Sequence, residues 1–189
     1  MIKPIVPFVK PLARIRIPSP PHGLRIAVIP DGQVHPGVPI DHWVWCGKYL
    51  ALKRPDVIIQ LGDFTDLPSL STHDAKGSLA LEGKRYQNDI NYSKFTMGLF
   101  MNELHKVPGW HPKLYMTLGN HEHRIIRTVE NDPKLEHLIS LDDLKYEDFG
   151  WRVYPFLQPI VVGGVAFCHY FPSGVMGRPI TSAKALLAK

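Results

Sequence analysis

The sequence predicts an α/β protein built from layers of strands and helices. Short apolar runs rich in β-branched residues alternate with longer segments of helical period, a pattern that packs helices over strands. The length of 189 residues suits one domain, and 44% hydrophobic with 21% charged residues is ordinary for a chain that buries a core. These observations exclude a disordered chain and argue against two domains.

Five apolar segments predict the strands. They are Leu24–Ile29, Asp56–Leu61, Lys113–Leu118, Trp151–Tyr154 and Ile160–His169. Gly163-Gly164 interrupts the last segment, which predicts a hairpin turn between two shorter strands.

Two segments have the period of a helix that is apolar on one side. In Asp41–Lys53, Trp43 and Leu50 fall on one face, and Ile90–Val107 is the second predicted helix. The polar stretch Pro68–Asn88 between them lacks a period, so we expect a long loop there. In an enzyme such a loop often overhangs the site.

The formal net charge of +5 arises at the N-terminus, because five bases precede the first acid, Asp31, and the remainder balances 17 bases against 17 acids. Six prolines occur among the first 21 residues. We therefore expect residues 1–22 to form a basic, extended arm that packs along the body or a partner, and residues 23–189 to form the domain. The balanced body argues against a cationic groove for nucleic acid.

The sequence also predicts the compartment. No stretch approaches the roughly 18 apolar residues of a membrane span, and early prolines interrupt any signal-peptide core. Two cysteines, Cys46 and Cys168, form neither a disulfide framework nor a cysteine metal cluster, and we expect Cys168 in the core. We expect a cytoplasmic protein that has no membrane partner.

Polar residues follow four of the predicted strands at the point where each ends. They are Asp31, the pair Asp63 and Asp66, Asn120, and His169. Because open α/β sheets gather ligands at the carboxyl ends of their strands, we expect these side chains to converge on one pocket. Carboxylate, amide and imidazole groups without thiolate suit divalent ions such as Mn, Fe, Zn, Ni or Mg. The sequence therefore predicts a metal centre.

The blocks that carry these residues also follow a known order. Asp31-x-Gln33, Gly62-Asp63-x-x-Asp66, Gly119-Asn120-His121-Glu122 and His169 together resemble the calcineurin-like metallophosphoesterase superfamily, over residues 24–172. The resemblance implies a layered β-sheet sandwich flanked by helices, and two divalent metal ions, with Mn as the first choice.

The resemblance also assigns metal ligands. It implies that Asp63 bridges the two ions, that Asp31 completes the first site, and that Asn120 and His169 complete the second. The family usually has a histidine two residues after the first Asp. This chain has Gln33 there, so either the Gln33 amide oxygen coordinates or His35 takes its place.

By the same resemblance His121 is catalytic and does not bind metal. It faces the substrate phosphate, where it either stabilises transition-state charge or protonates the leaving oxygen. Asp66 would hold the His121 imidazole. The alternative for Asp66 is a helix N-cap after the strand, a position that Asp favours.

The residues after His121 have two interpretations each. Glu122 and His123 either support the ligands from behind or begin a helix. Arg124 and Arg127 either clamp a substrate phosphate or solvate the helix, and Arg124 is, with Asn120, the candidate for substrate binding.

The reaction that the resemblance implies is hydrolysis of a phosphomonoester or phosphodiester by a metal-bridging hydroxide. Phosphorylated small molecules, nucleotides and nucleic acids all present suitable substrates. The sequence has no P-loop pattern and no G-x-S-x-G elbow, so nucleotide-dependent kinase and serine hydrolase chemistry have no support.

One departure from the family concerns the C-terminal part. Members carry a Gly-His-x-His block after the late histidine, and here no histidine follows His169. We therefore expect C-terminal strands to be missing, and self-association or a complementing second chain to cover the open edge. The alternative function is a catalytically silent or split fragment that acts as a binding or assembly subunit.

Overall fold

The centre of the protein is a four-stranded parallel sheet in the order β2-β3-β4-β5. A computed structural model describes residues 13–15, 17, 23–72, 82–173 and 178–187. The strands are β2 (Ile26–Ile29), β3 (Val57–Gln60), β4 (Lys113–Thr117) and β5 (Arg152–Tyr154). Every residue of β3 is buried, as expected for an inner strand covered on both faces. The predicted α/β class and these four strands are confirmed.

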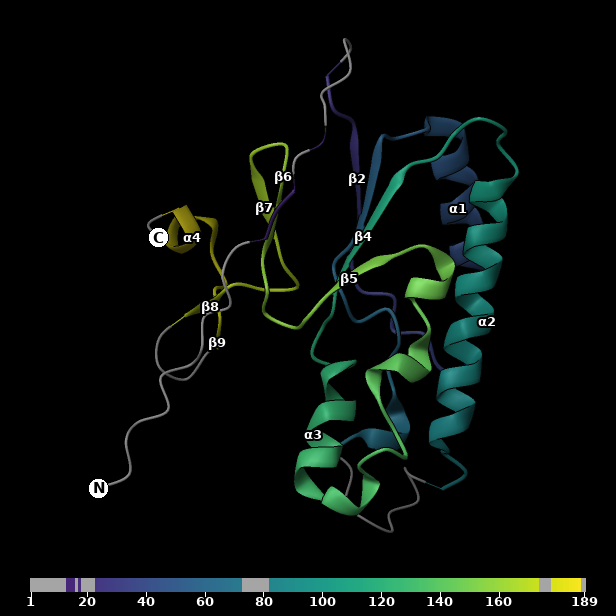
Figure 1. Cartoon of the computed structure of the whole chain (residues 1–189), viewed down its shortest axis with the longest axis vertical. Helices are drawn as coiled ribbons and strands as arrows, with labels where there is room; N and C mark the ends of the chain where they lie inside the picture. Colours follow the sequence, from purple (N-terminus) through teal and green to yellow (C-terminus); the bar gives the residue numbers. More distant parts are fainter. Residues whose placement is uncertain (1–12, 16, 18–22, 73–81, 174–177, 188–189) are drawn as a thin grey trace.

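Two long helices, α1 (Asp41–Lys53) and α2 (Tyr86–His105), cover one face of this sheet (Figure 1). Trp43 from α1 and Phe100 from α2 meet edge to face in the main core, with ring centroids 5.6 Å apart. The bounds predicted for α1 are confirmed. The prediction for α2 is wrong at both ends, because its first turn is polar and begins at Tyr86 and because it ends at His105.

Because α2 begins at Tyr86, the predicted loop Pro68–Asn88 is also partly wrong. A short 3₁₀ helix, η1 (Pro68–Leu70), opens that stretch, and its last three residues belong to α2. Residues 73–81 lie outside the described part of the chain.

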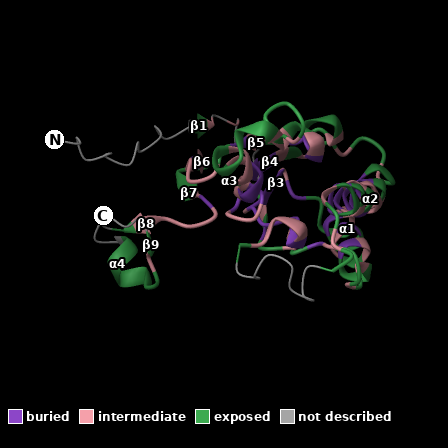
Figure 2. Cartoon of the chain, turned by 90° about the horizontal axis from the view of Figure 1, so that it is seen from below, coloured by how far each residue is buried: buried purple, intermediate pink, exposed green. Residues whose placement is uncertain are grey.

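A second, smaller sheet covers the other face in the order β1-β6-β7. Its strands are β1 (Ala13–Ile15), β6 (Ile160–Val162) and β7 (Val165–Phe167), and β1 runs parallel to β6. Gly163 and Gly164 both have positive φ, which confirms the predicted hairpin turn between β6 and β7. Figure 2 shows β3 and β4 buried between the helices and this sheet. The molecule is therefore a layered sandwich.

The remaining elements are short. They are α3 (His123–Asn131), the 3₁₀ helices η3 (Pro133–Leu135), η4 (Leu141–Leu144) and η5 (Glu147–Phe149), the strand pair β8 (Pro172–Ser173) and β9 (Arg178–Pro179), and α4 (Ala183–Leu187). Cys168 is buried, as predicted. Within the described part of the chain, no helix is both long and apolar enough to cross a membrane.

Candidate metal centre

The loops after β2 and β3 are joined by backbone hydrogen bonds where the strands end. The N–H groups of Gly32 and Gln33 both donate to the carbonyl oxygen of Asp63, at 2.8 Å each. Asp63 has φ of +52°, a left-handed conformation that an ordinary residue adopts only when its surroundings hold it there. The Asp63 side chain is thereby fixed at the carboxyl edge of the sheet.

Gly119, directly after Leu118, allows the loop after β4 to approach Asp63 closely. A Cβ atom on Gly119 would overlap the carboxylate and the backbone nitrogen of Asp63. The N–H of His121 then donates to Asp63 Oδ1 at 2.8 Å. Only glycine at position 119 permits this contact between the two loops.

The fully buried carboxylate of Glu122 joins the loops that follow β3 and β4. We call this carboxylate the clamp. Its Oε2 accepts from the N–H groups of Asp63 and Gly119, both at 2.9 Å, and its Oε1 accepts from the N–H of Thr65 at 3.2 Å. Burial first, and then the charge of Asp63, raise the pKa of Glu122. The sequence suggested that Glu122 either supports the ligands or begins a helix. The structure supports both, because Glu122 also occupies the N-cap position of α3.

Three candidate ligands converge beside this clamp. His169 Nε2 lies 2.9 Å from Asn120 Oδ1 and 3.4 Å from Asp63 Oδ2. The other ring nitrogen, Nδ1, lies 2.8 Å from the carbonyl oxygen of Leu61, which can only accept, so Nδ1 carries the proton. The amide oxygen of Asn120 and the carboxylate oxygen of Asp63 therefore both lie beside Nε2, and atoms of these three types are ligands of divalent cations.

Asp31 approaches this cluster from the loop after β2. Its Oδ1 lies 3.9 Å from His169 Nδ1, and its side chain is 52% exposed. Burial is the largest influence on Asp63 and raises its pKa, against the opposing effects of the His121 N–H and the His169 charge. A cation bound to the carboxylate would lower this pKa again.

The structure does not bring Gln33 or His35 into this cluster. Gln33 is exposed and has φ of +50°. His35 Nε2 lies 3.9 Å from Asp66 Oδ2, and its Nδ1 lies 2.8 Å from the carbonyl oxygen of Pro36. Among the described residues, no group of three or more His, Cys, Asp or Glu side chains is arranged to hold a metal ion. Which of Gln33 and His35 coordinates stays a prediction.

His121 and Asp66 form a second cluster next to the first. His121 Nδ1 lies 2.6 Å from Asp66 Oδ1, and His121 Nε2 lies 3.6 Å from Asp63 Oδ2. Burial lowers the pKa of His121, but the Asp66 hydrogen bond and the Asp63 charge outweigh it, so the net shift is upward. The hydrogen bond from His121 lowers the pKa of Asp66. Asp66 does not cap a helix, because the N-cap of η1 is Leu67.

Arg124 lies against this pair and is buried. One guanidinium nitrogen, Nη1, donates to the carbonyl oxygens of Asp66 at 2.7 Å and Leu67 at 3.3 Å. The other, Nη2, lies 3.3 Å from His121 Nε2. From the sequence, Arg124 either binds a substrate phosphate or extends into solvent. In the structure its guanidinium instead contacts the turn that carries Asp66. Substrate binding by Arg124 stays a prediction.

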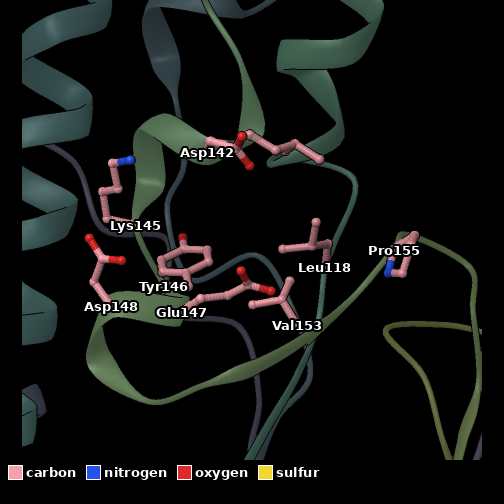
Figure 3. A pocket seen from close by; sticks show the side chains of 9 residues that line it. Leu118, Asp142, Lys145, Tyr146, Glu147, Asp148, Val153 and Pro155 are labelled. Carbon is pink, nitrogen blue, oxygen red and sulfur yellow. The ribbon is translucent and has the colours of Figure 1, made fainter.

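A cavity of about 420 Å³ lies beside the ends of β4 and β5 (Figure 3). Figure 3 shows Lys145 and Asp148 on one side of it and Leu118 and Val153 on the other. No predicted ligand lines it; its walls are Leu118, Leu141, Asp142, Lys145, Tyr146, Glu147, Asp148, Val153 and Pro155. Tyr146 links this cavity to the clamp, because its hydroxyl donates to Glu122 Oε1 at 3.4 Å.

The layered sandwich thus brings Asp63, Asn120 and His169 together. The sequence model of the calcineurin-like phosphoesterase family matches residues 24–183, so the chain belongs to this family. Neither a curated protein nor a solved structure matches the chain significantly.

Proposed function

We propose that this protein is a metal-dependent phosphoesterase that hydrolyses a phosphomonoester or a phosphodiester. The observation that carries the proposal is the convergence of Asp63 Oδ2, Asn120 Oδ1 and His169 Nε2, three atoms of types that bind divalent cations. Membership of a family of calcineurin-like phosphoesterases supports the same reaction.

The donor set fits divalent metal ions. Asp63, Asn120 and His169 would hold them, with Asp31 completing the set, and we propose two ions with Mn as the first to test. Bound ions supply charge for the phosphoryl oxygens and a nucleophilic water at neutral pH. We propose Asp63 as the ligand shared by both ions, because its carboxylate lies between the His169 ring and the His121 ring.

His121 acts on the substrate side of this centre. Asp66 accepts the Nδ1 proton and so fixes the ring, which leaves Nε2 on the edge that faces Asp63. A proton held at Nε2 is then available to the leaving oxygen, or to stabilise negative charge on the phosphoryl group.

The test is hydrolysis of an aryl phosphate and an aryl phosphodiester in the presence of added Mn. We expect turnover that is abolished by EDTA and by Asp63→Ala. Asp148→Ala is the matched control, because Asp148 is an exposed carboxylate on η5 outside the candidate centre, and it should keep full activity. Background rates in the unmodified protein would favour the alternative, a catalytically silent assembly subunit.

A further inference from the structure

A group of aromatic rings stands against one side of the candidate centre. Phe156 follows β5, Tyr170 follows His169, and His123 begins α3, so three separate elements contribute to it. The Phe156 centroid lies 4.9 Å from that of His123, 5.5 Å from that of Tyr170 and 6.3 Å from that of His169. We call His123, Phe156 and Tyr170 the aromatic wall.

The aromatic wall differs from the aromatic core of the protein. Trp43, Phe64 and Phe100 are at most 3% exposed, whereas all three rings of the wall keep partial exposure. Phe156 also packs against the main core, but none of the three rings of the wall is buried. Partly exposed rings at the rim of a polar site are typical of surfaces that bind planar groups.

The aromatic wall lies directly beside the candidate metal centre. The Tyr170 ring centroid lies 5.6 Å from that of the candidate ligand His169. A phosphate held at the centre would therefore place the rest of its ester next to the wall.

From this arrangement we propose that the aromatic wall binds a nucleobase while the phosphate of the same nucleotide lies at the metal centre. The inference rests on the proposed function and narrows its substrate class to nucleotides. A nucleobase supplies a planar ring for Phe156 and Tyr170, and every base has such a face, so the wall selects nucleotides over alkyl phosphates without selecting one base.

The activity test compares two esters with the same leaving group, p-nitrophenyl thymidine 5′-phosphate and methyl p-nitrophenyl phosphate, with Mn present. We expect the protein to prefer the thymidine ester. Phe156→Leu should lower kcat/KM for that ester about tenfold, chiefly through KM, and change the methyl ester less than about twofold. Phe95→Leu is the matched control, because Phe95 is a 57% exposed ring on α2, and it should change neither rate. Equal losses on both esters would overturn the inference.

A binding test separates this inference from the proposed function. Equilibrium dialysis with Mn present should give AMP a lower Kd than ribose 5-phosphate, and Phe156→Leu or Tyr170→Leu should remove the difference while the Kd of ribose 5-phosphate stays unchanged. This result would support the wall even if neither ester were hydrolysed. Equal affinity of the unmodified protein for AMP and ribose 5-phosphate would overturn it, even if both esters were hydrolysed. Tighter binding of a short single-stranded oligonucleotide than of AMP would assign the base to a nucleic acid rather than to a free nucleotide.

Discussion

Replacing Glu122 tests how the metal loops are held in place. Three backbone N–H groups, those of Asp63, Thr65 and Gly119, donate to its carboxylate, and the side chain is fully buried. Glu122→Ala would leave these donors without a partner and out of reach of water. Each orphaned donor costs about 1–3 kcal/mol, but loss of the buried charge offsets part of the sum, so we expect a net loss of about 3–5 kcal/mol.

Urea unfolding followed by circular dichroism measures this loss, and Glu122→Gln is the conservative comparison. Its single amide oxygen can replace Oε2 and keep two of the three backbone hydrogen bonds, while the amide nitrogen would face the N–H of Thr65. We expect Glu122→Gln to lose about 1–3 kcal/mol. An Ala variant that unfolds within about 1 kcal/mol of the unmodified protein would refute the clamp. Mn affinity should fall in Glu122→Ala, because the N–H of Asp63 loses its partner, and should change less in Glu122→Gln, which keeps that hydrogen bond.

Other variants test the neighbouring contacts. Asp63→Ala should retain fewer than two metal ions by elemental analysis, and two tightly held ions would rule out a bridging carboxylate. Gly119→Ala should weaken Mn binding in calorimetry, because the added methyl group overlaps the Asp63 carboxylate; unchanged affinity would mean that the loops can separate freely. The folded-state pKa of His121 is raised, so its contribution to stability is full below about pH 6.5 and is lost as the pH rises through that pKa. In urea unfolding with EDTA present, the free energy of unfolding should therefore fall above pH 6.5, and Asp66→Asn should flatten the fall; an equal fall in Asp66→Asn would contradict the pairing. Arg124→Ala should lower kcat while Mn affinity stays, and added guanidinium should restore part of it, whereas a rise in KM alone would identify Arg124 as a phosphate clamp.

The fold was predictable where local pattern decides it. The apolar run that became β3 is flanked by a turn residue and a Gly-Asp block, and α1 has one apolar face with Trp43 and Leu50 buried. The pairing of β1 with β6 was not predictable. β1 has three residues, and its partner lies near the other end of the chain, so no local period indicates the contact.

The candidate centre was predictable for a different reason. Asp63 and Asn120 come shortly after β3 and β4, and the parallel sheet brings such positions to one edge. His169 comes shortly after β7 of the second sheet, which packs over the first. The functions of Glu122 and Arg124 could not be deduced in the same way. Their partners are backbone N–H and carbonyl groups of a distant loop, which have the same chemistry at every position of the sequence. Only the adjacency of Glu122 to the Gly119-Asn120-His121 block indicated that it belongs to the site.

Nitrogen NMR spectra of the histidine rings test directly whether a cation binds between Asp63, Asn120 and His169. The protein is titrated with Zn²⁺, a diamagnetic substitute for Mn. We expect the Nε2 resonance of His169 to shift on Zn²⁺ addition while its Nδ1 stays protonated toward the Leu61 carbonyl. The nitrogens of His121 should show no Zn²⁺ coordination, since we expect this ring not to bind the metal. A His169 spectrum that Zn²⁺ leaves unchanged, or a Zn²⁺ shift confined to His121, would contradict the proposed centre.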